Sequence, residues 1–378
     1  MKRWMGILLT ALLLTGCAEQ QAAEPVAAAD ENAEPNSRTV FAMDTVMELI
    51  AYGADDALME AAEQEILGLE SRLSVTDAGS EIYALDHNGL AELSPDTTEL
   101  MQTALEMCER TDGALDVSIY PVLRAWGFTT GSYQVPTQEE IENLLTQVDY
   151  RKVTLENGTA SIAQGMEVDL GSVAKGYTGD QVSQLLREGG VTSALLNLGG
   201  NVQLVGGKPD GSDWRVAVQD PESDGYLGVL SLRDKAAITS GGYERYFVGD
   251  DGEVYWHIID PATGAPARSG LISVTVIGDR GVVCDALSTA LFVMGLDKAA
   301  EYWRRYGDFE AVFVAEDGSV AITSGLQDCF TLADGEKTWL QATTSKTCEY
   351  QKEEREITPA WNTNDERPCH ASIIFNGS

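Results

Sequence analysis

The chain has 378 residues, 44% of them hydrophobic, so it can bury a sizeable core, which excludes wholesale disorder. Its 60 acidic residues outnumber its 25 basic residues and give a formal net charge of −35. A surface this acidic repels phosphate backbones and argues against a nucleic-acid-binding protein.

The first twenty residues have the pattern of an export signal. Two basic residues precede an apolar run to Leu14, and small residues then lead to Cys17 in "LTGC". The run is too short for a transmembrane helix. Because the pattern resembles a bacterial lipoprotein signal, we expect residues 1–16 to be removed and Cys17 to be lipidated, which would anchor the protein to a membrane without spanning it. An ordinary signal peptide with a chance cysteine is the alternative.

Residues 17–37, rich in Ala, Glu, Pro and Asn, are predicted to form a flexible linker. The folded part is predicted over residues 38–335 and begins with "RTVFAMDTVMELIAYG", whose alternating apolar residues indicate a strand pair or one long strand. Four segments with helical spacing follow, and the third opens with a capping box formed by Thr137 and Glu140. These predicted helices cover residues 55–74, 94–113, 136–148 and 173–190.

From about residue 191 the pattern changes to strands, with "GDDG" as a hairpin turn. A strand over residues 271–278, a helix over 281–295 and a hairpin over 310–325 follow. Helices and antiparallel strands are partly segregated along the chain, which indicates the α+β class, with antiparallel sheets flanked by helices. Residues 336–378 show no sustained periodicity and are predicted to be a disordered tail outside the fold.

The predicted helix over residues 281–295 carries polar residues in an apolar sequence. Asp285, Ser288 and Thr289 share one face. Asp285 is either a helix cap or, with Thr289 one turn later, half of a Mg²⁺ site, since a carboxylate and a hydroxyl are hard oxygen ligands.

Four other stretches each allow two interpretations. Lys175 lies in "VDLGSVAKGYTGD". Either this stretch forms a turn that binds phosphate or metal and Lys175 supplies a positive charge there, or it is a plain strand-to-helix turn with a solvated lysine. His257, in "YWHIIDPATGAP", is a general base for a hydroxyl or a satisfied core histidine. Asp116, in "GALDVSIYPVLRAWGF", lies in a pocket wall or a core segment. The glycines of "LNLGGNVQLVGG" allow close approach of a ligand or mark a bulge.

Taken together, these stretches resemble the ApbE family of FAD:protein FMN transferases over residues 38–332. The shared stretches, in chain order, are "MDTVMEL", "GALDVSIYPVLRAWGF", "VDLGSVAKGYTGD", "LLNLGGNVQLVGG", "ITSGGYERYF", "HIIDPATGAP" and "VTVIGDRGVVCDALSTALFVMG". The resemblance implies a single catalytic domain that moves the FMN half of FAD onto a threonine, sometimes a serine, hydroxyl of a partner protein and releases AMP. This is phosphoryl transfer, in which two negative phosphates are held while a hydroxyl is aligned with the bond that breaks.

The resemblance also implies roles for particular positions. The Mg²⁺ ligands fall on Asp285 and Thr289, completed by a backbone carbonyl near Ser172, and His257 is the base, so that His257 and Asp285 are the implied catalytic residues. The FAD contacts fall on Met43, Ala114, Leu115, Asp116, Asp169, Lys175, His257 and Ile259.

The implied partners are FAD and an acceptor flavoprotein with a threonine-containing motif, met at the outer face of the cytoplasmic membrane. Two other functions would use the same residues. A Mg²⁺-dependent hydrolase would release FMN and AMP from FAD without an acceptor. A non-catalytic flavin-binding lipoprotein would bind FAD without turnover.

Overall fold

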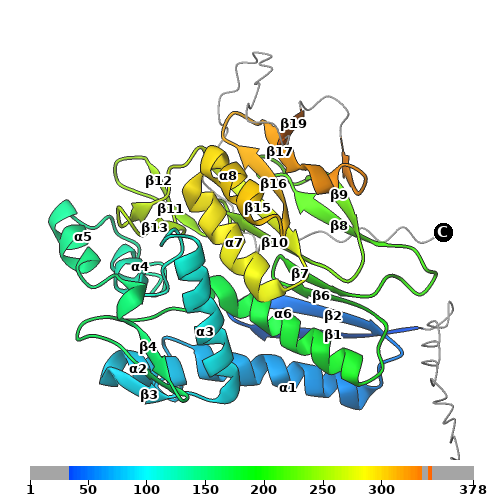
Figure 1. Ribbon diagram of the computed structural model, residues 1–378, viewed down its shortest axis with the longest axis horizontal. Coiled ribbons are helices and arrows are strands. Elements are labelled where there is room, and N and C mark those ends of the chain that lie inside the picture. The colour runs from blue at the N-terminus through cyan, green and yellow to red at the C-terminus, as the bar shows by residue number, and fades with distance from the viewer. Residues whose placement is uncertain (1–33, 334–338, 343–378) are drawn as a thin grey trace, which may run out of the picture.

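The structure is a computed structural model that describes residues 34–333 and 339–342 (Figure 1). Within these residues, one nine-stranded sheet has the strand order β1-β2-β6-β7-β10-β15-β16-β17-β19. Its neighbouring strands pair antiparallel, except that β19 runs parallel to β17. The strands are β1 (Pro35–Ala42), β2 (Thr45–Tyr52), β6 (Ser193–Leu198), β7 (Asn201–Val205), β10 (Ala236–Gly241), β15 (Leu271–Gly278), β16 (Glu310–Ala315), β17 (Val320–Thr323) and β19 (Trp339–Ala342).

The two faces of the sheet are covered differently. Helices α1 (Asp56–Leu73), α6 (Gly171–Glu188), α7 (Gly281–Met294) and α8 (Leu296–Tyr306) pack on one face. A three-stranded sheet of β18 (Phe330–Leu332), β9 (Tyr226–Leu232) and β8 (Trp214–Gln219) packs on the other. Strand alternation produces this arrangement, because Ala236 and Ile238 of β10 join the core under the helices while Ala237 joins the core between the sheets.

The remaining helices lie together at one side of the helical face (Figure 1). They are α2 (Glu81–Asn88), α3 (Pro95–Arg110), α4 (Tyr120–Trp126) and α5 (Gln138–Leu145), with the 3₁₀ turn η1 (Tyr150–Lys152). The small strands of this region are β3 (Leu90–Glu92), β4 (Thr154–Glu156) and β5 (Thr159–Ser161). Two short hairpins and a second 3₁₀ turn complete the description: β11 (Tyr246–Val248) with β12 (Val254–Trp256), β13 (Ile259–Asp260) with β14 (Ala265–Pro266), and η2 (Ser324–Leu326).

The predicted α+β class, with antiparallel sheets flanked by helices, is confirmed. The five predicted helices are present with ends displaced by no more than a few residues, and the capping box of Thr137 and Glu140 forms at the start of α5. Helices α2, α4 and α8 were not predicted. Helices α2 and α4 have only 8 and 7 residues, too few for a clear helical period, and α8 begins directly after Gly295, which ends α7.

The structure corrects two predicted boundaries. Strand β1 begins at Pro35 and pairs residue by residue with β2, so residues 35–37 belong to the sheet and not to the predicted linker over 17–37. Strand β19 lies within the predicted disordered tail over 336–378 and joins the main sheet by parallel pairing with β17. The signal, Cys17 and most of the linker lie outside the described residues, as does the rest of the tail. No helix in the described part of the chain is long and apolar enough to span a bilayer.

Candidate active site

Asp285 lies in the second turn of α7, and it does not cap that helix. The N-terminus of α7 is capped from another helix: the Asp180 carboxylate of α6 accepts the backbone N–H groups of Gly281 at 2.7 Å and Val282 at 3.0 Å. These are two of the N–H groups that a helix cannot satisfy internally. Of the two interpretations of Asp285, the cap is therefore wrong, and the carboxylate is available for another role.

Close packing of α6 against α7 fixes where Asp285 points. A Cβ atom on Gly176 would lie 2.3 Å from the Gly281 carbonyl oxygen and 2.7 Å from Asp285 Cβ, so only glycine permits this approach. The close contact lets the Gly176 backbone N–H donate to Asp285 Oδ2 at 2.8 Å. In a regular helix that N–H would bond the Ser172 carbonyl. The Asp285 carboxylate thus accepts a donor that a regular helix would give to the Ser172 carbonyl. The role of that carbonyl as a metal ligand stays a prediction.

Thr289 lies one helical turn after Asp285 and belongs to a chain of hydroxyls. Ser240 of β10 has its Oγ 2.7 Å from Ser288 Oγ and 3.3 Å from Thr289 Oγ1. Ser288 in turn donates to the Asp285 carbonyl at 2.9 Å. The polar atoms of this group are all oxygens, the ligand type that Mg²⁺ prefers. Mg²⁺ usually binds few protein ligands and keeps several waters. Within the described residues, no three His, Cys, Asp or Glu side chains group as a metal site.

The carboxyl groups of the site are held in an environment that resists negative charge. Burial raises the pKa of Asp285, and the Lys175 ammonium and the Gly176 N–H act in the opposite direction. Burial also raises the pKa of Glu244 to about 7, with Lys175 again opposing and Asp285 reinforcing the rise. Lys175, predicted as a phosphate contact, therefore lies near the buried Asp285 and the half-buried Glu244, and its charge lowers the pKa of both carboxyl groups.

His257 follows strand β12, and its neutral form is strongly favoured. Burial, with the nearby charges of Arg245 and Lys175, lowers its pKa to about 4. Its backbone N–H donates to the Arg245 carbonyl at 3.1 Å, and Nδ1 lies 3.2 Å from the same oxygen. A carbonyl only accepts, so Nδ1 carries the proton and Nε2 has a free lone pair. The ring therefore keeps Nε2 unprotonated at neutral pH.

Met43 and Asp169, two of the predicted FAD contacts, lie at element ends. Met43 and Asp44 form the turn between β1 and β2, with φ angles of 50° and 59°, and the Met43 N–H donates to Glu70 at 2.6 Å. Asp169 precedes α6, where its Oδ1 accepts the Gly171 N–H at 2.7 Å. Burial raises the pKa of Asp169, while Arg245 and Lys175 lower it. Asp169 therefore lies within reach of the same two cations as His257.

The predicted FAD contacts at residues 114–116 lie in a loop that is mostly buried. The Asp116 Oδ1 atom accepts both the N–H and the hydroxyl of Ser118, at 2.8 and 2.6 Å, and Oδ2 accepts the Tyr150 N–H at 3.2 Å. Its carboxylate thus orders this loop. Leu115 is buried in the main core, and Ala114 packs partly against it.

Ile259 is also buried, in a separate cluster with Trp126 and Ile141. A ligand contact from Leu115 or Ile259 would therefore come from the backbone.

The glycine pair in "LNLGGN" proves to be a tight turn and not a bulge. Gly199 and Gly200, both at positive φ, join β6 to β7. A Cβ on Gly199 would lie 2.2 Å from Thr45 Oγ1, so the glycine also allows this turn to pack against β2.

Sequence reasoning missed Asp180, Ser240, Glu244 and Arg245, although all four lie inside or beside stretches that it singled out. No local pattern marked them, because each acts on a partner that is distant in the sequence.

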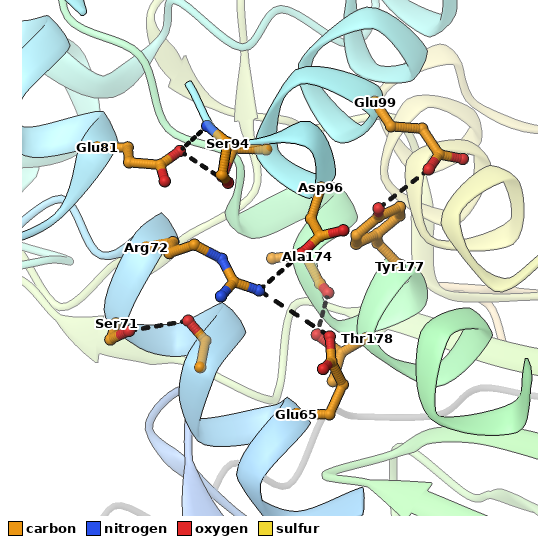
Figure 2. A network of polar contacts seen from close by, with 12 residues as sticks. Glu65, Ser71, Arg72, Glu81, Ser94, Asp96, Glu99, Ala174, Tyr177 and Thr178 are labelled. Atoms are coloured by element: carbon orange, nitrogen blue, oxygen red, sulfur yellow. Dashed lines mark hydrogen bonds and ion pairs between the residues drawn. The ribbon is translucent and has the colours of Figure 1, made fainter. Parts of the chain in front are cut away.

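The other side of α6 is held by a separate group of polar contacts (Figure 2). Arg72 of α1 pairs with Asp96 of α3 at 3.0 Å, and the Tyr177 hydroxyl of α6 donates to Glu99 at 3.2 Å. These contacts tie α1, α3 and α6 together. They fix the helix that supplies Lys175 and Gly176 to the site.

The ApbE family profile matches residues 43–313 of this chain. The chain belongs to the ApbE family. Among ApbE relatives, it is 33% identical to a protein of Treponema pallidum named FAD:protein FMN transferase, over 77% of this chain and 88% of that protein. It is also 33% identical to the FAD:protein FMN transferase of Klebsiella pneumoniae, over 72% of this chain and 87% of that one.

Solved ApbE structures agree with the fold. The ApbE protein from Thermotoga maritima superimposes with a TM-score of 0.73 at 31% identity, covering 78% of this chain and 99% of that one. The flavin transferase ApbE from Vibrio cholerae superimposes with a TM-score of 0.72 at 26% identity, covering 79% and 99%.

Proposed function

We propose that this chain transfers FMN from FAD to a threonine or serine hydroxyl of an acceptor protein and releases AMP. Its relatives, matched over most of their length, carry the name FAD:protein FMN transferase. The observation in the structure that carries the proposal is the contact between α6 and α7. It brings Asp285, the Ser172 turn and Lys175 together, near a histidine held neutral.

We propose a Mg²⁺ site formed by Asp285, Thr289 and the Ser172 carbonyl. The Gly176 N–H donates to Asp285 Oδ2 and so orients the carboxylate. The Ser240 hydroxyl orients Thr289 in the same way. When bound, Mg²⁺ would act as a Lewis acid toward the pyrophosphate and offset its charge. Such a cation would also remove the cost of an ionised Asp285, whose pKa burial raises.

The rest of the reaction is assigned to residues of this chain. Lys175 binds phosphate oxygens of FAD and limits repulsion between the pyrophosphate and the acidic protein. The acceptor hydroxyl forms a bond to the FMN phosphorus while the bond to the oxygen that leaves with AMP breaks. Nε2 of His257 takes the hydroxyl proton, a role for which the neutral imidazole is prepared by its Nδ1–H contact with Arg245.

We propose further that the enzyme works outside the cytoplasm as a lipoprotein anchored through Cys17, and that its acceptors carry a threonine-containing flavinylation motif. The support is the signal-like N-terminal sequence and the spacer that follows it. Export would separate the enzyme from cytoplasmic flavoproteins and leave exported or membrane-bound acceptors as substrates. Replacing Cys17 by Ser should move the protein from the membrane fraction to the soluble fraction. Retention of the variant at the membrane would contradict the anchor.

The transferase is tested by mixing the chain with FAD, Mg²⁺ and a threonine-containing acceptor domain. Intact mass is read on the acceptor, and AMP is measured in the same sample. We expect the acceptor to gain one FMN for each AMP released, and the gain to be lost on chelation or when the acceptor threonine is replaced by alanine. AMP release that is independent of acceptor would instead identify a FAD hydrolase. FAD binding without AMP would identify a flavin-binding protein.

A further inference from the structure

Arg245 lies next to His257, on the segment between β10 and β11, and no role has yet been assigned to its side chain. Its backbone carbonyl accepts both the His257 N–H and the His257 ring, at 3.1 and 3.2 Å. These contacts fix the Arg245 backbone at the site. They do not involve the guanidinium, so a substitution of the side chain leaves them in place.

The guanidinium of Arg245 has unusually weak partners for an arginine in this fold. Nη1 lies 3.5 Å from the Phe128 carbonyl, and Nη2 lies 3.8 Å from Asp44, whose side chain is 84% exposed. The closest carboxylate contacts of the other ion-paired arginines in the described residues measure 2.6–3.1 Å. A guanidinium offers five donors, and Nη1 and Nη2 here make only these long contacts with the described part of the chain.

The surroundings of this guanidinium are those of the proposed FAD site. Its Nη2 faces Asp44, the residue after Met43, and its charge acts on both Asp169 and His257. Met43, Asp169 and His257 are all proposed FAD contacts. The chain has a net charge of −35, which repels a pyrophosphate. A local positive charge is therefore needed to bind one.

We propose that Arg245 is a catalytic residue that binds the pyrophosphate of FAD through its guanidinium. The planar fork matches two phosphate oxygens at once, which the Lys175 ammonium does not. As the acceptor oxygen bonds to the FMN phosphorus, the bond from that phosphorus to the bridging oxygen breaks. The bridging oxygen leaves on AMP as the hydroxyl proton passes to His257. Arg245 stabilises the charge that collects on the departing phosphate. The inference rests on the proposed transferase function.

The test compares ligands that differ in their phosphates. Binding of FAD and of riboflavin, which has no phosphate, is measured by flavin fluorescence for the unmodified chain, Arg245→Gln and Arg245→Lys. Loss of a charged hydrogen-bonding partner should weaken FAD binding about 10- to 100-fold in Arg245→Gln, with riboflavin affinity unchanged within about twofold. Arg245→Lys should recover part of the loss. Arg233→Gln is the matched control, since Arg233 is similarly exposed (45% against 41%) and pairs with Asp213 at a distant turn.

Unchanged FAD affinity in Arg245→Gln would overturn the inference, and so would an equal loss for FAD and riboflavin, which indicates a structural role. If Arg245→Gln does not fold, Arg245→Met replaces it and is judged by the same ratio. Transfer of FMN by the unmodified chain is measured separately. If the unmodified chain transfers FMN but Arg245→Gln shows no loss of binding specific to FAD, only the role of Arg245 is refuted. No transfer by the unmodified chain refutes the proposed function, while the binding ratio still reports on Arg245.

Discussion

A polar cluster lies on each side of helix α6, and the two clusters differ in how their charged groups are paired. The helix-bridging cluster, around Arg72 and Tyr177, joins each charge to a partner within the fold (Figure 2). The candidate active site, around Asp285 and His257, combines carboxyl groups whose pKa values are raised by burial with two cations, Lys175 and Arg245, whose charges oppose that rise. The first cluster pairs its charged groups with one another, whereas under the proposed function a metal and phosphates would bind at the second.

Burial explains why the two clusters differ in energy. The side chains of Arg72 and Asp96 are 28% and 40% exposed, so water screens their attraction and the pair contributes little to stability. Asp285 and His257 are held in environments that disfavour their charged forms. Such groups reduce stability at neutral or acidic pH and are retained where function needs them.

Replacing His257 by Asn should lower the rate of FMN transfer about 100- to 10,000-fold, the range expected for loss of a general base. FAD binding should change much less, because Asn retains a polar side chain of similar size. The comparison is made at saturating FAD and acceptor. Transfer at more than a tenth of the original rate would show that His257 is not the base.

Replacing Asp285 by Asn should lower Mg²⁺-dependent transfer by about 100-fold or more, because a neutral amide is a poor ligand for a hard cation. The Gly176 N–H can still donate to the amide oxygen, so the fold should be kept. Activity is measured over a Mg²⁺ titration. A rate and Mg²⁺ dependence like those of the unmodified protein would exclude Asp285 as a ligand.

The imidazole of His257 should stay neutral well below pH 6. With a pKa of about 4, about 3% of it is protonated at pH 5.5, against about 90% for an ordinary histidine. Because the folded pKa lies below the unfolded value, stability should fall as the pH drops below about 6.5. NMR titration of the ring, with His257→Asn to assign it among three histidines, measures the pKa. A midpoint near 6.5 would contradict the buried environment.

Replacing Asp180 by Ala should destabilise the protein by about 2 kcal/mol, since two N–H groups at the start of α7 lose their acceptor. Asp180→Asn, which keeps one acceptor oxygen, should cost less. Chemical denaturation gives both values. Equal stability of Asp180→Ala and the unmodified protein would mean that the cap is unimportant.

Replacing Arg72 by Ala should cost about 1 kcal/mol or less and leave transfer unchanged, because its ion pairs are partly exposed. This variant is the reference for the helix-bridging cluster. A large loss of transfer with little loss of stability would show that this cluster also serves the reaction, and the contrast between the two sides of α6 would fail.

Much of this protein follows from local sequence. Helices α1, α3, α6 and α7 are predicted by apolar spacing over enough turns to be distinguished from strands, and the shorter α5 is marked by its capping box. The i,i+4 relation of Asp285 and Thr289 follows from helix geometry alone. The order of motifs along the chain indicates the ApbE family.

Only the tertiary structure shows that Asp285 does not cap α7. Its competing role as a helix cap belongs to Asp180, 101 residues before Gly281 in the chain, and its orientation depends on Gly176, which meets α7 without a side chain. The approach of Arg245 to the Met43 turn likewise depends on the β1–β2 hairpin lying beside the segment after β10. Sequence patterns report interactions within a few residues. Contacts between distant segments depend on how closely two backbones pack, and that distance is set only when the whole core is assembled.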